Sequence, residues 1–188
     1  MNLPNSITMG RLLITSGTFV CLELVSDPSE PEAPLVWLAF GLFLVAAISD
    51  ILDGYFARRY GMVTAFGRVA DPFADKVLIC GTLVILLEFP ATGDLLPSWI
   101  VVIVIAREFL VTAVRGLVEA AGIPFPADRL GKYKMIVQCV TASALLTMVA
   151  GATTFRAVAE WGVWVTLLLT VVSGAGYVYK ARAILFAS

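Results

Sequence analysis

The chain has 188 residues, of which 60% are hydrophobic and 14% are charged, whereas an ordinary soluble domain carries about 25% charged residues. This composition argues against a soluble globular protein. The formal net charge is -1, so the protein has no overall positive charge that would attract nucleic acid, and we expect no nucleic-acid partner. The chain contains no histidine, which leaves acid–base chemistry to carboxylates, Lys, Tyr or Cys.

Six apolar segments are long enough to cross a membrane, because a spanning helix needs about 20 residues. Proline and glycine clusters separate them. The first segment lacks the basic start and the small-residue cleavage site of a signal peptide, so we expect it to be retained. Residues 2–8 are expected to form a short interfacial lead-in. The predicted spans are 7–25, 35–57, 69–90, 97–121, 131–150 and 158–181.

The fold class predicted is therefore an all-α integral membrane protein, a bundle of six transmembrane helices with a short interfacial N-terminal segment, in one domain over 1–188. Cysteines Cys21, Cys80 and Cys139 lie singly in apolar runs. Because they have no C-x-x-C spacing, we expect neither a disulfide framework nor a zinc site. They are interpreted as small apolar residues, buried or facing lipid.

Basic residues predict the orientation, because they are retained on the cytoplasmic side of a membrane. Of the thirteen, only Arg156 falls in a connection on the other side. The connections 26–34, 88–96 and 151–157 are thus expected to face out, with both termini in the cytoplasm. The predicted location is a bacterial-type cytoplasmic membrane. The basic residues on the cytoplasmic side are Arg11, Arg58, Arg59, Arg68, Lys76, Arg107, Arg115, Arg129, Lys132, Lys134, Lys180 and Arg182.

Four aspartates lie where the second span ends and the third begins. Asp50 and Asp53 precede the connection at Gly61, and Asp71 and Asp75 follow it. A charged residue at the centre of a membrane helix costs about 2.5–3.5 kcal/mol, so such residues are functional candidates. Helical spacing places each pair on one face, and antiparallel neighbouring helices would bring the four carboxylates together.

Four converging carboxylates require a cation, because like charges at short range otherwise force protonation. All-oxygen ligands select Mg²⁺, Mn²⁺ or Ca²⁺, and four acids suffice for two ions. Two such ions are typical of phosphoryl transfer. Gly54, Ala57 and Gly67 leave room for a bulky ligand, and Arg58 could neutralise its phosphate. Taken singly, these three small residues would more often lie at a helix–helix contact.

The complete pattern resembles the signature of the CDP-alcohol phosphotransferase family. The resemblance implies two divalent cations, Mg²⁺ or Mn²⁺, held by the four aspartates, and an active site at the cytoplasmic face. It also implies that Asp75 acts as the catalytic base and that a CDP-linked donor is bound. The signature positions are Asp50, Asp53, Gly54, Ala57, Arg58, Gly67, Asp71 and Asp75; the donor-binding residues implied are Asp50, Gly54, Ala57, Arg58 and Gly67.

Outside the signature, further stretches include Asn2-Leu3-Pro4-Asn5, Ala106-Arg107-Glu108 and Gly131-Lys132-Tyr133-Lys134. In these stretches the chain resembles the bacterial phosphatidylglycerophosphate synthases of this family. This likeness implies CDP-diacylglycerol as donor and glycerol 3-phosphate as acceptor, within membrane lipid. The chemistry agrees, because a second, soluble phosphate needs cations. Met135 departs from the Thr expected after the second Lys. The acceptor-phosphate residues predicted are Arg107, Arg115, Lys132 and Lys134, with Lys76 and Arg11 as supporting candidates.

Several alternatives stay open at the level of sequence. Lys132 and Lys134 could be cytoplasmic anchors only, and Arg107 could form a structural ion pair with Glu108 or an aspartate. The acceptor could instead be inositol phosphate, serine or phosphatidylglycerol. Outside the enzymes, intramembrane aspartates could mark a cation transporter. The sequence also leaves open whether the chain forms a homodimer.

Overall fold

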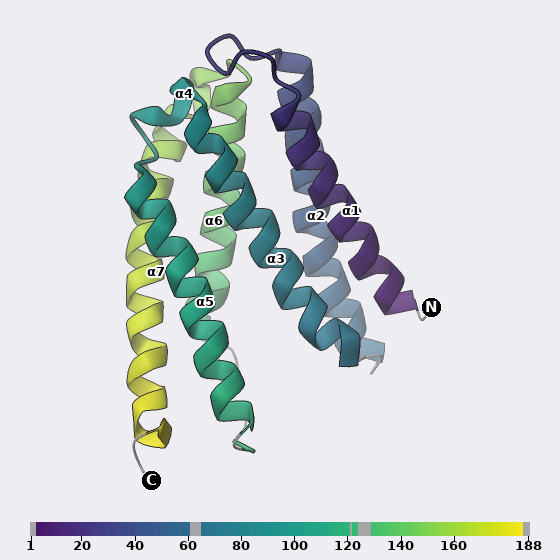
Figure 1. Cartoon of the computed structure of the whole chain (residues 1–188), viewed down its shortest axis with the longest axis vertical. Coiled ribbons are helices and arrows are strands. Elements are labelled where there is room, and N and C mark those ends of the chain that lie inside the picture. Colours follow the sequence, from purple (N-terminus) through teal and green to yellow (C-terminus); the bar gives the residue numbers. More distant parts are fainter. Residues whose placement is uncertain (1–2, 61–64, 121, 124–128, 186–188) are drawn as a thin grey trace.

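The computed structural model describes residues 3–60, 65–120, 122–123 and 129–185. Within these ranges the chain is helical, with no strand, which confirms the all-α prediction. The long helices alternate in direction, and both ends of the chain lie at the same end of the bundle (Figure 1). The elements are α1 Leu3–Glu23, α2 Ala33–Tyr60, α3 Ala65–Ile85, η1 Leu86–Glu88, α4 Pro90–Gly93, α5 Ser98–Ala120, α6 Arg129–Val149, η2 Thr153–Phe155 and α7 Arg156–Leu185.

The N-terminal lead-in differs from the prediction. Residues 3–8 are the first turns of α1, continuous with the rest of that helix, instead of a separate segment. Pro4 does not interrupt the helix, because the amide hydrogens of the first turn have no intrahelical partner. The described part of the N-terminus therefore extends the first helix of the bundle.

Two glycines end helices at the points where the sequence predicts breaks. Gly122 has φ 76° and Gly151 has φ 87°, a conformation that side chains disfavour. In each case the amide of the glycine and the amide of the next residue donate hydrogen bonds to carbonyls of the preceding helical turn. The N–H of Ile123, for example, donates to the carbonyl of Val118 at 3.3 Å. This is the Schellman arrangement. It explains why α5 ends at Ala120 and α6 at Val149.

The bundle consists of two groups of helices. Helix α1 packs against α2 and α3, and α7 packs against α5 and α6, while α2–α6 and α3–α5 contacts join the groups. Small residues allow two close crossings. A Cβ on Gly81 would lie 2.3 Å from the Phe19 ring, and one on Gly162 would lie 2.5 Å from Thr141 Oγ1. Close backbone approach of this kind is typical of helices packed within a membrane.

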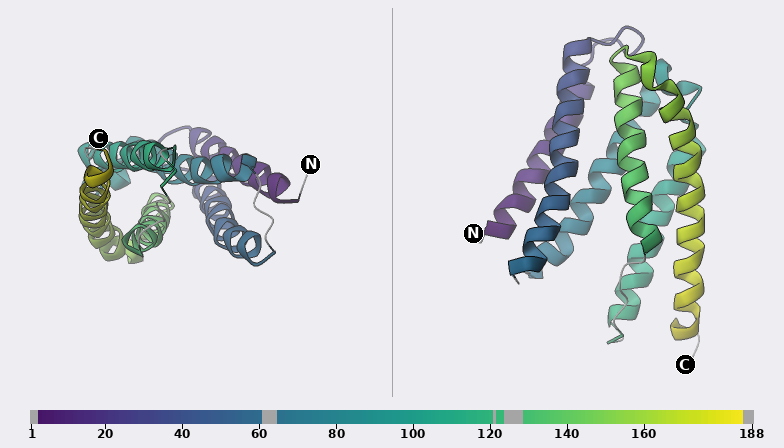
Figure 2. Two further views of the ribbon diagram at one scale, coloured as in Figure 1. Left: turned by 90° about the horizontal axis from the view of Figure 1, so that it is seen from below. Right: turned by 180° about the vertical axis from the view of Figure 1, so that it is seen from behind.

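The end of the bundle opposite the termini is closed by η1 and α4. Phe89 and Leu96 are buried there against the core. The hydroxyl of Thr92 is also buried and donates a hydrogen bond of 2.9 Å to the carbonyl of Phe89. These contacts hold the connection between α3 and α5 against the helix ends. Seen from behind, α2 and α6 converge at this end and diverge toward the other (Figure 2).

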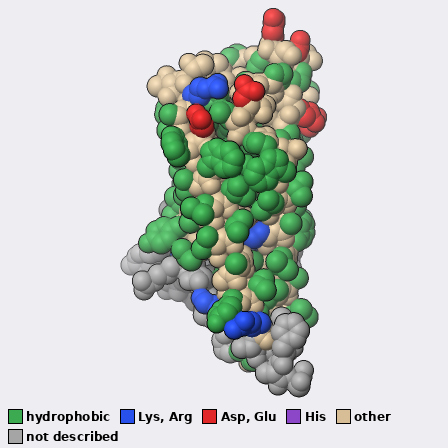
Figure 3. Space-filling view, turned by 90° about the vertical axis from the view of Figure 1, so that its left-hand side faces the viewer, with side chains coloured by type: hydrophobic (Ala, Val, Ile, Leu, Met, Phe, Trp, Pro, Cys, Tyr) green, Lys and Arg blue, Asp and Glu red, His purple; other side chains and the backbone are tan. Residues whose placement is uncertain are grey.

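The surface is divided into bands along the bundle axis. On the face in Figure 3, hydrophobic side chains cover the middle, acidic ones gather at the upper end, and Lys and Arg predominate toward the lower end. Within the described residues, two stretches are long and apolar enough to cross a membrane, 33–50 in α2 and 153–182 in η2 and α7. Six spans are not confirmed by this criterion. Charged residues interrupt the others, as Arg107, Glu108 and Arg115 do in α5.

Candidate active site

A buried arginine joins the first three helices of the bundle. The side chain of Arg11, on α1, is 1% exposed. Its NH1 nitrogen lies 2.6 Å from Oδ1 of Asp50 on α2 and 3.0 Å from Oδ1 of Asp75 on α3. The two carboxylates are 19% and 25% exposed. The predicted convergence of acids from the second and third helices is therefore observed for Asp50 and Asp75.

The other residues of the acidic signature lie on the same two helices. Asp53, Gly54, Ala57 and Arg58 follow Asp50 along α2, which continues to Tyr60, while Gly67 and Asp71 precede Asp75 on α3. The helical spacing used for the prediction is thus present in the backbone. The side chains of these six residues lie outside the described part of the structure. Among the described residues, no three acidic or cysteine side chains form a group that could hold a metal.

A second buried charged cluster lies between α5 and α6. Oε1 of Glu108 accepts hydrogen bonds from NH1 of Arg107 at 3.3 Å and from Nζ of Lys134. The three side chains are 12%, 9% and 5% exposed, respectively. The ion pair between Arg107 and Glu108, which the sequence left open as an alternative, is therefore present, and it includes Lys134 as a third member.

Helix α7 positions the arginine of this cluster. NH2 of Arg107 donates a hydrogen bond of 2.9 Å to Oγ of Ser173, and the guanidinium lies 5.7 Å from the centre of the Tyr177 ring. Gly174 gives the arginine space, since a Cβ there would lie 3.0 Å from Cγ of Arg107. Nε of Arg107 is buried without a hydrogen-bond partner in the described structure, so one donor remains for a ligand.

Two of the four predicted acceptor residues do not join this cluster. Arg115 is 43% exposed and its Nε donates a hydrogen bond of 2.8 Å to Glu119, one turn along α5. Lys132 is exposed on α6. Arg107 and Lys134 therefore form the buried part of the predicted acceptor site, and Arg115 and Lys132 lie at the surface.

The two charged clusters are neighbours. The Cys139 thiol, on α6, lies within electrostatic reach of Asp50, Asp75 and Lys134. Carboxylates from α2 and α3 and a buried ammonium group thus lie near the same residue. A metal–phosphate group and a second phosphate could be bound side by side in such an arrangement.

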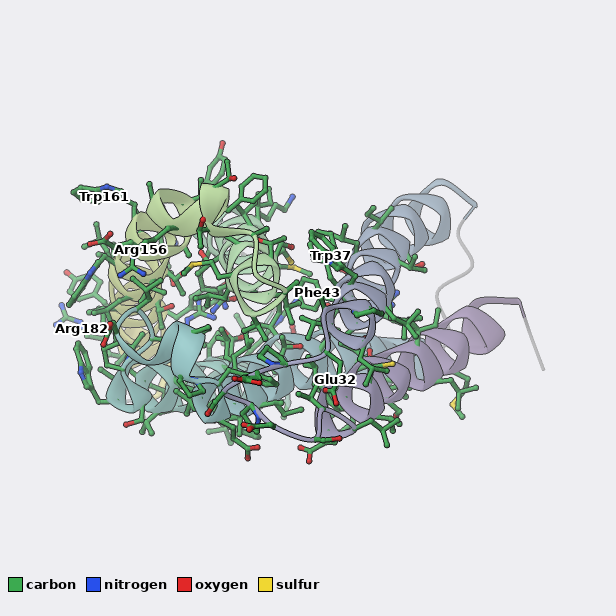
Figure 4. All side chains as sticks on the ribbon, turned by 90° about the horizontal axis from the view of Figure 1, so that it is seen from above. Glu32, Trp37, Phe43, Arg156, Trp161 and Arg182 are labelled. Atoms are coloured by element: carbon green, nitrogen blue, oxygen red, sulfur yellow. The ribbon has the colours of Figure 1, made fainter. Side chains whose placement is uncertain are left out.

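An apolar groove of about 670 Å³ lies between α2 and α6. Several of its lining side chains are about half exposed, so the groove is open along its length. Trp37 points into the space between the two helices, whereas Trp161 on α7 points away from the bundle (Figure 4). The last α2 residue in the groove lining is Ile48, two positions before Asp50, which places one end of the groove near the aspartates. The lining residues include Trp37, Phe40, Ile48, Met135, Val140, Ser143, Phe155 and Val158.

Comparison with known proteins identifies the family. A model of the CDP-alcohol phosphatidyltransferase family matches residues 1–172. The chain belongs to this family. The match includes α1, α2, α3, α5 and α6 and more than half of α7, so it covers both charged clusters.

Several curated proteins are similar in sequence to this phosphatidyltransferase over nearly its whole length. The chain is 38% identical to the CDP-diacylglycerol–glycerol-3-phosphate 3-phosphatidyltransferase of Bacillus subtilis (strain 168), over 95% of this chain and 94% of the relative. It is 32% identical to the Rickettsia felis protein of the same name, over 96% and 94%. A probable phosphatidylglycerophosphate synthase of Mycobacterium tuberculosis is 35% identical over 96% and 81%. The chain is thus an enzyme of phospholipid biosynthesis, and the cation-transporter alternative is set aside.

Two described carboxylates of this family member are of the type that binds a divalent cation. Asp50 and Asp75 come from different helices and both reach one positive group, the Arg11 guanidinium. Carboxylate oxygens are the ligands that Mg²⁺ and Mn²⁺ prefer. The same end of the bundle therefore supplies oxygen donors that are already held close together.

Two residues, Arg11 and Glu108, contribute more to the charged clusters than their sequence positions indicate. Arg11 was only a supporting candidate, and Glu108 entered only as an ion-pair partner for Arg107. Both are charged residues within long apolar segments, a signal that marks functional candidates in membrane helices. Arg11 pairs with residues on α2 and α3, and Glu108 pairs with Lys134 on α6 as well as with its neighbour Arg107. The pattern therefore identifies these residues as candidates but does not show their roles.

Proposed function

We propose that the enzyme transfers a phosphatidyl group from CDP-diacylglycerol to glycerol 3-phosphate, giving phosphatidylglycerophosphate and CMP. The observation that carries this proposal is the placement of the buried cations Arg107 and Lys134 beside the Asp50–Asp75 pair. An acceptor that bears its own phosphate needs such cations, whereas serine does not. The printed names of the Bacillus and Rickettsia relatives support the same donor and acceptor.

Two divalent cations would be held by Asp50, Asp53, Asp71 and Asp75, and they would neutralise the donor pyrophosphate and its developing charge. Around them, Gly54, Ala57 and Gly67 give the cytidine access to the backbone, and Arg58 pairs with the pyrophosphate. These assignments follow from the family signature and from the positions of the residues on α2 and α3. Arg107 and Lys134 hold the acceptor phosphate, and Arg115 and Lys132 attract it at the entrance.

The reaction proposed is a single in-line displacement at phosphorus. The 1-hydroxyl oxygen of glycerol 3-phosphate bonds to the phosphorus of the phosphatidyl group, and the bond from that phosphorus to the oxygen of CMP breaks. Asp75 takes the hydroxyl proton as general base. The protein mainly positions the two substrates and stabilises charge, which is the usual division of work in phosphoryl transfer.

The acyl chains of the donor are assigned to the groove between α2 and α6. The groove is apolar, and Cys139 in its lining lies within electrostatic reach of the aspartates. At about 1.5 Å per residue, Trp37 and Ile48 are separated by about 16 Å along α2, about half the 30 Å thickness of a bilayer core. The groove therefore has the length of one leaflet and the polarity of a lipid chain.

The bundle is proposed to cross the bacterial cytoplasmic membrane six times, with both termini and the active site on the cytoplasmic side. The apolar middle band and the Lys- and Arg-rich lower end support this orientation. Both charged clusters then lie where a water-soluble acceptor can reach them.

The test is CMP release by purified enzyme with CDP-diacylglycerol and Mg²⁺ or Mn²⁺. We expect release to require glycerol 3-phosphate and to stop with EDTA, while inositol 1-phosphate, serine and phosphatidylglycerol give none. Asp75→Asn should lower the rate by at least about a thousandfold, since general-base catalysis and charge neutralisation are both affected. Asp94→Asn, at the opposite end of the bundle, is the matched control and should retain full activity. Release with a different acceptor would overturn the acceptor assignment.

A further inference from the structure

Glu108 is an acid in a site that is proposed to bind an anion. Its Oε1 accepts hydrogen bonds from both Arg107 and Lys134, so the buried cluster carries two positive charges and one negative charge. A carboxylate in direct contact with the acceptor phosphate would repel it. The location of Glu108 therefore needs an explanation other than substrate contact.

The two cations of the cluster depend on Glu108 to different degrees. Arg107 is also held from α7, through its hydrogen bond to Ser173 and its position over the Tyr177 ring. For Lys134, Glu108 is the hydrogen-bond partner within the described part of the chain. Since the lysine side chain is 5% exposed, loss of this carboxylate would leave its ammonium group buried with no compensating charge.

The contacts of Glu108 also leave the arginine able to bind an anion. Glu108 takes NH1 and Ser173 takes NH2, while Nε has no partner within the described structure. Gly174 lies against the same part of the side chain, with a Cβ position 3.9 Å from Nε. The arginine is thus fixed at its tip, and its Nε is a buried donor with no partner within the described structure.

We propose that Glu108 is the positioning residue of the acceptor-phosphate site. It keeps Lys134 charged and directed toward Arg107, so that the two cations are in place before the acceptor arrives. It does not touch the acceptor itself. This inference rests on the proposed function, because it assigns the acceptor phosphate to Arg107 and Lys134.

The test compares Glu108→Gln, which removes the charge with little change in shape, with Glu108→Asp and with Glu160→Gln. Glu160 is exposed on α7 near the opposite end of the bundle. In the CMP-release assay we expect Glu108→Gln to raise KM for glycerol 3-phosphate by about tenfold or more, with KM for CDP-diacylglycerol within about twofold of wild type. Glu108→Asp should recover part of the loss, and Glu160→Gln should match wild type. Inhibition by inorganic phosphate should weaken in Glu108→Gln in parallel with the rise in KM.

A double variant separates positioning from simple support of the fold. If Glu108 acts through Lys134, then the double variant Glu108→Gln/Lys134→Met should have the same KM for glycerol 3-phosphate as Lys134→Met alone. It also removes the buried unpaired charge, so it remains informative if Glu108→Gln does not fold. Additive effects of the two changes, an equal loss toward both substrates, or a lower KM in Glu108→Gln would overturn the inference.

Failure of this inference differs from failure of the proposed function. If wild-type enzyme releases CMP only with glycerol 3-phosphate and Glu108→Gln keeps its KM, then Glu108 is not a positioning residue although the function holds. If wild-type enzyme gives no release with glycerol 3-phosphate, then the acceptor assignment itself is wrong.

Discussion

Arg11 holds together the two described carboxylates of the acidic signature. Its replacement by Met would leave Asp50 and Asp75 facing each other without the guanidinium. Breaking a buried ion pair in this way costs about 3–5 kcal/mol. We therefore expect Arg11→Met to lower Tm in detergent when EDTA is present, and Mg²⁺ to raise the Tm of this variant more than that of wild type, because the cation replaces the lost charge.

The matched control for this experiment is Arg156→Met. Arg156 is exposed at the start of α7, and this helix begins at the end of the bundle opposite the chain termini (Figure 1). It should show the wild-type Tm and the wild-type response to Mg²⁺. An equal Mg²⁺ response in Arg11→Met and wild type would show that Arg11 and the cation do not share the carboxylates.

The sequence predicted which charged side chains lie inside the bundle but not the residues with which they form ion pairs. Asp50 and Asp75 were placed together correctly, because helical spacing and one short connection determine their approach. The pairing of Lys134 with Glu108 depends on how α5 packs near α6. No local sequence pattern encodes how closely these two helices pack.

The groove between α2 and α6 is the feature of helix arrangement to which we assign the acyl chains of the donor. Filling it with a bulky residue, as in Ser143→Trp, should reduce kcat/KM for long-chain CDP-diacylglycerol by about tenfold, through loss of the space for an acyl chain. A short-chain donor such as the dihexanoyl form should be used nearly as well as by wild type. Measuring both donors in mixed micelles separates the effect on the groove from a general loss of activity.

Val102→Trp is the control for the groove variant. Val102 is 64% exposed on α5 and does not line the groove, so the added ring has room. Both donors should be used at wild-type rates. If Ser143→Trp impairs long and short donors equally, then the groove does not hold the acyl chains.

At the scale of elements, proline and glycine positions predicted the helix ends well. Gly122 and Gly151 end α5 and α6 through the left-handed conformation that favours glycine. The η1–α4 connection was predicted only as a break between Pro90 and Pro97, and its helical turns depend on burial of Phe89 and Thr92. The groove could not be predicted, because it results from the divergence of two helices that are separated in sequence.

The arrangement of charge over the whole molecule predicts its orientation in the membrane. Cysteines introduced at Ser29 and Thr154, in connections at the acidic end, should react with a membrane-impermeant maleimide in right-side-out vesicles. A cysteine replacing the exposed Lys132 should react only after the membrane is permeabilised. The native cysteines are free, and Cys21 is buried, so wild-type enzyme gives the background. The reverse pattern of labelling would place the active site outside.

For the whole molecule, composition predicted the helical class, and the count of basic residues predicted one basic end. The number of membrane crossings is harder to read from apolarity. Charged residues such as Arg107 and Glu108 make α5 less apolar than an inert span, although α7 contacts Arg107 through its hydrogen bond to Ser173. Sites built inside a bundle therefore weaken the signal by which its spans are recognised.

The sideways opening of the groove has a kinetic consequence. Because its exposed apolar residues face outward from the bundle between α2 and α6, the donor is expected to arrive by diffusion in the plane of the membrane without passing through water. The rate of encounter with the donor then depends on the mole fraction of donor among the surrounding lipids. The rate of encounter with the acceptor depends on the concentration of acceptor in solution. Dilution of the donor with inert lipid should slow turnover at constant bulk donor concentration.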